Sequence, residues 1–359
     1  MRRKIVFYIA GLQRGGAERV IANLANYFDQ QNYQVTMFTD CILEKEYELN
    51  SGIKREVVGY EPTGKRVADM VKRVTVIRTA YQKIRPDVVV SFIGKTNIRA
   101  ILASFGTGIP VIVSVRSTPQ REYRSKAMKL LARILFCHAA GVVFQTEGAK
   151  QWFGKRIQKK SVILSNPLQE DAVKPCYEGE RANEIVTVGR CEKVKNQKLL
   201  VEAFLKIAEE FPDTVLKIYG DGAEREALER YAKGQPGGER VLFMGDCDGI
   251  PDLIYHSRIF ALSSNQEGMP NALMEAMALG LSVVSTDCPC GGPATIIRDE
   301  ENGLLVPVGD ADAMAEAFRK ILGNPSFEEK LRKNAAKLGQ ELAPEKVNRE
   351  WMEYIESVS

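Results

Sequence analysis

The sequence SSNQEGMPNALMEAMALG at residues 263–280 begins where a short apolar run at residues 259–263 ends, which predicts a buried strand leading into a loop and a helix. Pro270 keeps the residue before it out of helical geometry and is itself suited to a first helical position. Glu267 therefore lies in the loop, and Glu275 lies about one turn into the helix. A strand, a loop and a helix in this order form half of the βαβ unit from which doubly wound α/β folds are built.

The same alternation extends in both directions along the chain. Apolar runs that predict buried strands lie at residues 5–10, 34–39, 87–92, 110–115, 139–144, 161–164, 184–189, 215–219, 241–244, 259–263, 282–285 and 303–306. Amphipathic patterns that predict helices lie at residues 17–29, 67–84, 125–136, 198–209, 224–232, 271–279 and 311–321. These two βαβ series predict an α/β protein of two Rossmann-like doubly wound domains that face each other across a cleft.

The boundary between the two domains is predicted at residues 166–183. This stretch contains Pro167, Pro175 and Gly179 and has no apolar periodicity, and a chain of 359 residues is long enough for two domains. We therefore expect an N-terminal domain at residues 1–170 and a C-terminal domain at residues 171–359, whose last helix can pack back on the N-terminal domain.

The net charge of +4 conceals a basic half and an acidic half. Residues 1–170 carry 28 Lys and Arg against 13 Asp and Glu, whereas residues 171–359 carry 22 against 33. A basic half suggests an anionic partner such as nucleic acid, a membrane surface or phosphates. Hydrophobic residues at 45% and charged residues at 27% exclude disordered, collagen-like and disulfide-scaffold classes.

The cysteines and apolar runs indicate the compartment. Seven cysteines are an odd number without paired spacing, which favours a reducing environment. The first apolar run is too short for a signal peptide, and no run is long enough to span a membrane. We therefore expect a cytoplasmic protein that can lie on a membrane surface.

Two further loops follow predicted strands and carry residues suited to phosphate. Gly15 and Gly16 precede a helix, where bare backbone N–H groups suit a phosphate, although a tight turn also explains them. Their loop has neither the Walker nor the dinucleotide-binding spacing. Arg190 and Lys195 combine a forked donor with a mobile charge, which suits a diphosphate, although a solvated loop also contains such residues.

The two carboxylates of the opening segment have an alternative reading too. Glu267 and Glu275 can accept hydrogen bonds from sugar or ribose hydroxyls, while Gly268 leaves the loop backbone bare and the helix N-terminus adds a positive dipole end. Alternatively, the two glutamates only stabilise the start of a helix.

Glu267 and Glu275, with seven residues between them, resemble the E-x7-E motif of glycosyltransferase family 4, whose members have the GT-B fold of two facing Rossmann-like domains. Further segments resemble that family and follow its order over nearly the whole chain: Gly15-Gly16, Val188-Gly189-Arg190 with Lys195, residues 219–222, residues 243–245 and residues 301–306. Residues 15–19 and 288–293 are similar to bacterial members that extend lipid-linked oligosaccharides.

The resemblance implies a retaining hexosyltransferase that moves a hexose or N-acetylhexosamine from a UDP-sugar to a glycan acceptor. The acceptor is expected to be linked to a lipid pyrophosphate, in bacterial surface polysaccharide or glycoprotein glycan assembly. Neither a metal nor another cofactor is expected. In the mechanism proposed for the family, the leaving phosphate takes the acceptor proton, so no enzymic nucleophile is needed.

The resemblance also implies roles for individual residues. Arg190 and Lys195 hold the diphosphate and stabilise the charge on the leaving group, which preorganised cations can do. With Glu267 they are the expected catalytic residues. Glu275 binds the ribose hydroxyls. The donor hexose is held by Glu267 and by the backbone of Gly268, Met269, Pro270 and Asn271, and the Gly15 and Gly16 loop reaches the donor phosphate from the other domain.

One loop departs from the family pattern. Many members have a histidine after the strand that corresponds to residues 110–115, whereas this chain has Arg116. Arg116 can supply a donor to phosphate or to the acceptor sugar instead, or can have no function in a surface loop. His138 and His256 are the histidines of the chain, and a lone histidine in such a context is typically structural.

Rival sites remain open on the residues alone. Asp246 and Asp248 resemble a metal-binding Asp-x-Asp pair but lie late in a Rossmann-like series, and the cysteines have no Cys-x2-Cys pair for zinc. The helix at residues 125–136 is basic with an apolar face, which suits either an anionic membrane or a solvated crossover helix.

We expect a peripheral enzyme at the inner face of the plasma membrane, whose basic N-terminal domain meets the anionic membrane surface and the lipid-linked acceptor. A UDP-sugar epimerase on the same fold is the alternative. A non-enzymatic membrane or nucleic-acid binding protein explains the charge but not Arg190, Lys195, Glu267 and Glu275. Nucleic acid is not an expected partner, because no basic stretch is interleaved with aromatics.

Overall fold

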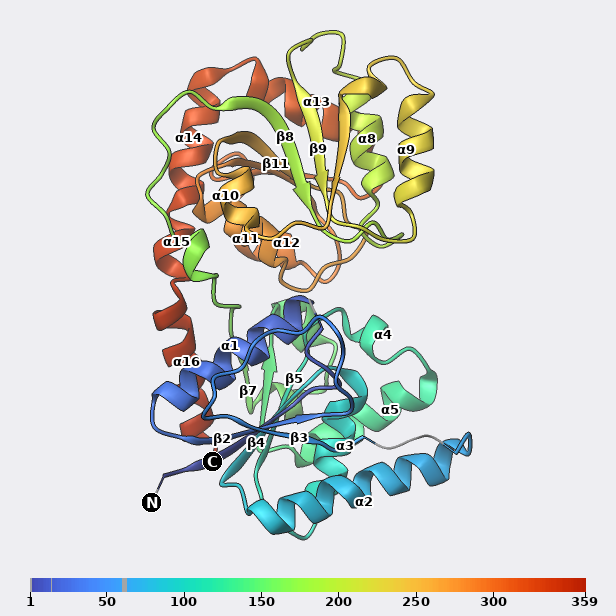
Figure 1. Cartoon of the computed structure of the whole chain (residues 1–359), viewed down its shortest axis with the longest axis vertical. Coiled ribbons are helices and arrows are strands. Elements are labelled where there is room, and N and C mark those ends of the chain that lie inside the picture. The colour runs from blue at the N-terminus through green and yellow to red at the C-terminus, as the bar shows by residue number, and fades with distance from the viewer. Residues whose placement is uncertain (1, 14, 60–62) are drawn as a thin grey trace. The chain divides into compact units, whose positions relative to one another are not determined.

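The computed structural model describes residues 2–13, 15–59 and 63–359, except for the side chain of Arg66, one of the basic residues of the N-terminal half. The chain forms two compact units (Figure 1). The first contains residues 1–166 and 345–359, and the second contains residues 167–344. The change of unit after Asn166 lies close to the expected boundary at residue 170. Residues 345–359 were expected in the C-terminal domain with a last helix that can pack back on the N-terminal domain. They belong to the first unit, where this helix buries its apolar side chains.

The first unit is built on a parallel sheet with the order β3-β2-β1-β4-β5-β6-β7. Its strands are β1 Lys4–Tyr8, β2 Gln34–Thr39, β3 Lys54–Val57, β4 Val88–Phe92, β5 Val111–Ser114, β6 Gly141–Phe144 and β7 Ser161–Ile163. Its helices are α1 Gly16–Gln30, α2 Arg66–Ile84, α3 Gly94–Ser104, α4 Pro119–Glu122, α5 Lys126–Leu135, α6 Glu147–Gln151, α7 Lys155–Gln158 and α16 Pro344–Ser357.

Aromatic residues that alternate along β1 and β2 attach helices to both faces of this sheet. Phe7 contacts Phe28 of α1 edge to face, whereas Phe38, on the other face, stacks on Tyr81 of α2. Alternate residues of a strand point to opposite faces, so the apolar residues of these strands are buried on both faces of the sheet. This sheet confirms the prediction of a doubly wound domain.

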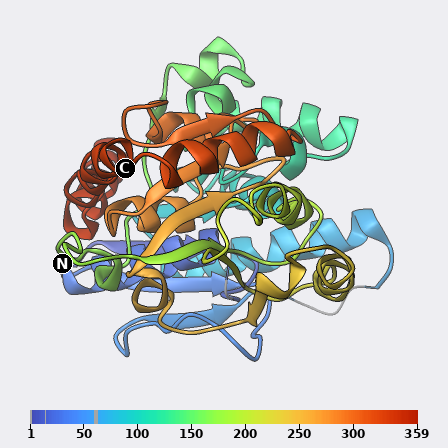
Figure 2. The same ribbon diagram turned by 90° about the horizontal axis from the view of Figure 1, so that it is seen from above.

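The C-terminal helix α16 lies beside α1 in both views of the molecule (Figures 1 and 2). Trp351 is fully buried and donates its indole N–H to the Ser165 carbonyl at 3.1 Å. The Tyr354 hydroxyl donates to the Lys160 carbonyl at 2.9 Å. A Cβ on Gly141 of β6 would lie 2.5 Å from that hydroxyl, so the strand needs glycine here to let α16 approach.

The second unit repeats the arrangement with the parallel order β10-β9-β8-β11-β12-β13. Its strands are β8 Ala182–Val188, β9 Val215–Tyr219, β10 Val241–Gly245, β11 Ser257–Leu262, β12 Ser282–Thr286 and β13 Leu304–Val306. Its helices are α8 Gln197–Leu205, α9 Arg225–Lys233, α10 Ile250–Ile254, α11 Asn271–Ala278, α12 Gly292–Ile296, α13 Ala311–Leu322, α14 Pro325–Ala336 and α15 Leu338–Glu341. Short 3₁₀ turns lie at Phe136–His138 in the first unit and at Glu170–Ala172 and Gly238–Arg240 in the second.

The core of the second unit lies between its sheet and three of its helices. Residues of α8, α9 and α13 form one buried cluster with side chains of the strands, whereas α11 contacts β11 and β12 outside that cluster. The strand order reverses between β8 and β11. In open α/β sheets a ligand binds beyond the carboxyl ends of the strands at such a reversal.

Among the described residues, no helix combines the length and apolarity that crossing a membrane requires.

Candidate functional site

The loop after β8 is held against the sheet edge by backbone contacts. Gly189 donates its N–H to the Tyr219 carbonyl at 2.9 Å, and Gly220 approaches so closely that a Cβ on it would lie 2.2 Å from the Gly189 oxygen. Gln197, at the start of α8, donates to the Arg190 carbonyl at 2.9 Å. The Arg190 side chain itself is 67% exposed and contacts Glu192 at 2.9 Å. The loop is therefore fixed while the Arg190 guanidinium remains accessible.

The loop after β11 is hydrogen-bonded to the loop after β8. The Asn265 N–H donates to the Val194 carbonyl at 2.8 Å, and the Asn265 side chain donates to the Lys193 carbonyl at 3.2 Å. Asn196 donates to the Asn265 side-chain oxygen at 3.1 Å. Ser263 donates its hydroxyl to the Lys195 carbonyl at 2.9 Å. The two predicted site loops thus form one structure at the reversal of strand order.

Lys195 and Glu267 meet at the centre of this structure. Lys195 Nζ lies 2.6 Å from Glu267 Oε1, and the Ser264 hydroxyl donates to the same oxygen at 2.5 Å. The two charged side chains are 26% and 12% exposed, respectively. Because both partners are mostly removed from water and Glu267 has a second donor, this charge-assisted pair has a defined geometry.

A third loop, after β12, supports Glu267 from behind. The Glu267 N–H donates to the Pro289 carbonyl at 3.0 Å, and the Cys290 N–H donates back to the Glu267 carbonyl at 3.3 Å. A Cβ on Gly292 would lie 1.4 Å from the Gly268 oxygen. Burial, with a contribution from Glu267, raises the pKa of Cys288 to about 12, so this thiol stays neutral at physiological pH.

The helix that follows, α11, begins at Asn271 with Pro270 as its N-cap, one position earlier than the first helical position expected for that proline. The N–H groups of the first helical turn have no acceptor within the helix and suit an anionic or polar ligand. Met269 and Glu275 are 6% and 5% exposed. Glu275 therefore lies one turn into the helix as expected, as a largely buried carboxylate.

In the first unit, Gly15 is the N-cap of α1 and donates its N–H to the Gln13 carbonyl at 2.7 Å. Its φ of −131° is accessible to any residue, so conformation does not require glycine here. A Cβ on Gly15 would lie 2.3 Å from Glu18 Oε2. Gly15 and Gly16 lie in a different unit from Lys195 and Glu267, and their expected contact with the donor phosphate stays a prediction.

Glu46 holds the loop before Gly15, and no sequence pattern indicates this role. Its carboxylate accepts the N–H of Leu43 at 3.1 Å and pairs with Arg55 of β3 at 2.5 Å and 2.9 Å. The Tyr47 N–H donates to the Leu12 carbonyl at 2.9 Å. Hydrogen bonding to Arg55 lowers the pKa of Glu46 below its ordinary value. Arg55 lies on a polar edge strand without an apolar run, which is why the pair was missed.

Arg116 lies inside the first unit and is 7% exposed. Its guanidinium donates to the Asn166 side chain and stacks on the rings of Phe92 at 4.7 Å and Trp351 at 5.7 Å. Burial lowers the pKa of Arg116 to about 9. These contacts join α16 to the sheet and indicate a structural role for Arg116, while its expected donation to phosphate or to the acceptor sugar stays a prediction.

Glu122 shapes the same loop after β5. Its carboxylate accepts the N–H groups of Gly94 at 2.9 Å, Arg116 at 2.6 Å and Ser117 at 2.8 Å. Burial raises the pKa of Glu122 to about 7, against the lowering effect of these three donors. Glu122 organises the loop by hydrogen bonds to its backbone, a role visible only in the structure.

The histidines and the rival metal residues lie elsewhere. His256 is exposed beside Tyr177 at the amino end of β11, the edge opposite the loops described above, and His138 contacts Phe105. Asp246 and Asp248 are exposed. In the described part of the chain, no three His, Cys, Asp or Glu side chains gather closely enough to hold a metal ion.

The structure thus brings Arg190, Lys195, Glu267 and Gly268 together at one edge of the second sheet, with α11 and Glu275 beside them. Sequence reasoning missed the residues that hold the loops together, namely the polar Gln197, Ser264 and Asn265 and the closely packed Gly292. Asn265 lies within the opening segment, but it bonds to the Lys193 carbonyl 72 residues away in sequence, which no local pattern shows. Ser264 bonds to the Glu267 side chain three residues further on.

Comparison with known proteins gives two family matches. The model "Glycosyltransferase Family 4" matches residues 14–171, and "Glycosyl transferases group 1" matches residues 170–338. A Campylobacter jejuni protein named GalNAc-alpha-(1->4)-GalNAc-alpha-(1->3)-diNAcBac-PP-undecaprenol alpha-1,4-N-acetyl-D-galactosaminyltransferase is 27% identical over 99% of both chains. A second C. jejuni protein, named as a 4-alpha-N-acetylgalactosaminyltransferase of a diphospho-undecaprenol substrate, is 23% identical over 98% of this chain and 99% of its own.

Solved structures show the same fold. The Anabaena protein HepE in complex with UDP superposes with a TM-score of 0.84 at 18% identity, over 99% of this chain and 100% of its own. The lipopolysaccharide outer core galactosyltransferase WaaB superposes with a TM-score of 0.79 at 20% identity, over 99% of both chains.

Proposed function

Because the chain belongs to glycosyltransferase family 4 and has the GT-B fold, we propose that it transfers a hexose or N-acetylhexosamine from a UDP-sugar to a lipid-pyrophosphate-linked glycan, with retention of configuration. The observation that carries the proposal is the pairing of Lys195 with Glu267 beside Arg190 at the reversal of strand order. The names of the two Campylobacter relatives support the lipid-linked acceptor, and the UDP complex of HepE supports the donor nucleotide. Both relatives are named as transferases, which gives the epimerase alternative no support.

In the proposed reaction the bond between the sugar C1 and the UDP oxygen breaks, and a bond from C1 to the acceptor oxygen forms on the same face. The acceptor proton passes to the leaving phosphate. Arg190 and Lys195 offset the charge that develops on that phosphate. Lys195 is already held by Glu267, so it loses little energy to reorganisation during the step. Glu267 orients Lys195 and accepts hydrogen bonds from the donor sugar. No metal is assigned to the reaction.

The role of Glu275 is tested by its replacement with alanine. We expect the variant to bind UDP about 10- to 100-fold more weakly, because hydrogen bonds to a charged group contribute about 1.5–3 kcal/mol. Calorimetric titration with UDP measures this. The control is Glu226→Ala. Glu226 lies on α9, outside the site loops, and its side chain is 89% exposed. Unchanged UDP affinity in the folded Glu275→Ala protein would refute the assignment.

The membrane partner is proposed from the charge and surface of the first unit. With the boundaries of the structure, this unit carries 30 Lys and Arg against 16 Asp and Glu, and the second carries 20 against 30. On α5, Leu130 is 61% and Ile134 is 52% exposed, next to Lys126, Lys129 and Arg133. Exposed apolar residues among cations are typical of helices that lie on anionic membranes. We infer that the enzyme is peripheral, at the inner face of the plasma membrane.

Binding to vesicles that contain anionic lipid is expected to fall steeply as salt rises, since each cation near such a surface contributes about 1 kcal/mol before screening. Cosedimentation measures it. The double variant Leu130→Ser with Ile134→Ser is expected to bind more weakly at every salt concentration, because it removes the apolar contact and keeps the charge. Equal binding to neutral vesicles would show that these cations do not contact anionic lipid and are only solvated.

A further inference from the structure

The edge of the second sheet opposite the candidate site borders a pocket of about 980 Å³. The residues around it lie at the amino ends of strands: Arg181 precedes β8 and Arg258 is near the start of β11. Cys176, Glu328 and Arg332 also line it. Because the donor loops follow the carboxyl ends of the same strands, this pocket is a separate place on the unit.

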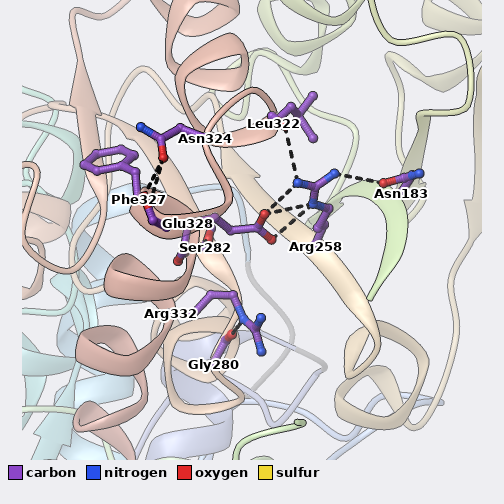
Figure 3. Close-up of polar contacts among 10 residues, drawn as sticks. Asn183, Arg258, Gly280, Ser282, Leu322, Asn324, Phe327, Glu328 and Arg332 are labelled. Atoms are coloured by element: carbon purple, nitrogen blue, oxygen red, sulfur yellow. Dashed lines mark hydrogen bonds and ion pairs between the residues drawn. The ribbon is translucent and has the colours of Figure 1, made fainter. Parts of the chain in front are cut away.

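One ion pair in the pocket is complete. Arg258 donates Nε and Nη2 to the Glu328 carboxylate at distances from 2.7 to 3.1 Å, and Nη1 to the Asn183 side chain at 2.9 Å (Figure 3). Glu328 is 6% exposed. A buried carboxylate with a bidentate arginine satisfies both charges, so this pair contributes no excess charge to the pocket.

Two other arginines have no carboxylate within 4.0 Å among the described residues. Arg181 is 8% exposed, and its Nη atoms donate to the carbonyls of Tyr255, Ser257 and Leu279. Its buried Nε has no hydrogen-bond partner in the described structure. Burial, with the neighbouring positive charge of Arg332, lowers the pKa of Arg181 to about 10. Cys176 and Glu328 act in the opposite direction on this pKa, but the Glu328 carboxylate is hydrogen-bonded to Arg258. Arg181 therefore has no carboxylate of its own, whereas a buried cation normally pairs with one.

Arg332 is the second arginine, and it lies beside the same helix end. Its Nε donates to the Gly280 carbonyl at 3.1 Å, as Figure 3 shows, and its Nη2 donates to the Tyr177 carbonyl at 2.8 Å. Leu279 and Gly280 follow directly after α11, so both arginines stabilise the carboxyl end of that helix. A helix end supplies about half an elementary negative charge, which is less than the two guanidinium charges.

We propose that this pocket binds a phosphate-class anion between Arg181 and Arg332. The anion supplies the missing counter-charge, and it accepts hydrogen bonds from guanidinium N–H groups that the carbonyls leave over. The acidic side chains that remain are at the rim: Glu178 and Glu180 are exposed, and Glu329 pairs with Lys333 at 2.6 Å. Because the second unit is acidic overall, the anion is expected to be a free phosphate or phosphate ester and not a lipid headgroup. The proposal does not depend on the proposed function.

Alkylation of Cys176 tests the proposal at the pocket itself. Inorganic phosphate is expected to slow the reaction of Cys176 with iodoacetamide, measured by peptide mass spectrometry, while the exposed Cys41 reacts at an unchanged rate. Arg332→Gln is expected to weaken this protection about tenfold or more in phosphate concentration. Lys333→Gln is the matched control, because that lysine lines the pocket but is already paired, and it is expected to shift protection less than threefold.

A second variant keeps the test decisive if Arg332→Gln does not fold. Glu178→Gln with Glu180→Gln is expected to strengthen protection, because it removes negative charge at the rim. Protection by vesicles of anionic lipid without any protection by phosphate would overturn the choice of a free anion. Absence of phosphate protection in the wild-type protein, or protection that is unchanged in a folded Arg332→Gln variant, would overturn the site. The readout is independent of donor binding, so its failure leaves the proposed function untouched.

Discussion

Replacing both Arg190 and Lys195 by alanine is expected to reduce sugar transfer at least about a thousandfold, because each removed donor to a developing charge costs about 10²- to 10³-fold in turnover. The leaving diphosphate gains negative charge, and these two side chains are the cations assigned to it. Lys195 is held by Glu267 at 2.6 Å, and Arg190 extends into solvent from a fixed loop. Initial rates with a panel of UDP-sugars and lipid-linked acceptors measure the effect.

The matched control is Lys193→Ala. Lys193 lies in the same loop and has an exposed side chain. Its backbone carbonyl accepts the Asn265 side chain, and with the described residues its side chain forms no hydrogen bond or ion pair. Its loss is expected to leave turnover within about twofold, since surface substitutions of this kind change little. Near wild-type transfer by the Arg190→Ala, Lys195→Ala protein would refute the leaving-group role.

The pair of Lys195 and Glu267 can be resolved further with single variants. In Lys195→Ala, Glu267 keeps the Ser264 hydroxyl but loses its cation while only 12% exposed. If the two side chains act as one unit, the double variant Lys195→Ala with Glu267→Ala is expected to have a turnover no lower than that of the more impaired single variant. The reason is that effects of residues in contact are not additive. Additive losses in turnover would show that Glu267 acts on the sugar independently of Lys195.

Much of the fold followed from the sequence because buried parallel strands have a strong local signature. The apolar runs at residues 34–39 and 215–219 coincide with β2 and β9, and the run at residues 259–263 overlaps β11. Strand β3 was missed because its sequence, Lys-Arg-Glu-Val, forms a polar edge that is not buried on both faces. Helix α3 was missed as well, since Gly94 begins it in a left-handed conformation that no apolar pattern predicts.

The candidate site divides in the same way. The spacing around Pro270 gave the loop and the helix, because proline acts on its immediate neighbours. The contact between Lys195 and Glu267 joins residues 72 positions apart and depends on the strand order, which local patterns do not contain. Arg116 shows the opposite limit. Its place in a loop after a strand suggested an exposed donor, but the apolar face of α16 covers it, and only the tertiary structure shows that Trp351 lies there.

Replacing Gly292 by alanine is expected to weaken UDP binding about 100-fold or more, because the new Cβ would lie 1.4 Å from the Gly268 oxygen. Overpacking of this kind forces backbone shifts that cost about 1–3 kcal/mol or more. The shift must move the loop that carries Glu267 and the N-cap of α11, since Pro270 Cδ lies only 3.4 Å from the same position.

The neighbouring Gly291 provides the control. Its φ of +84° makes alanine unfavourable by about 1–2 kcal/mol, but no atom lies within 4 Å of its Cβ position. Gly291→Ala is therefore expected to lose stability in thermal unfolding while it keeps its UDP affinity, whereas Gly292→Ala loses affinity in calorimetry. Normal UDP affinity in a folded Gly292→Ala protein would show that the Gly268 loop does not contact the donor.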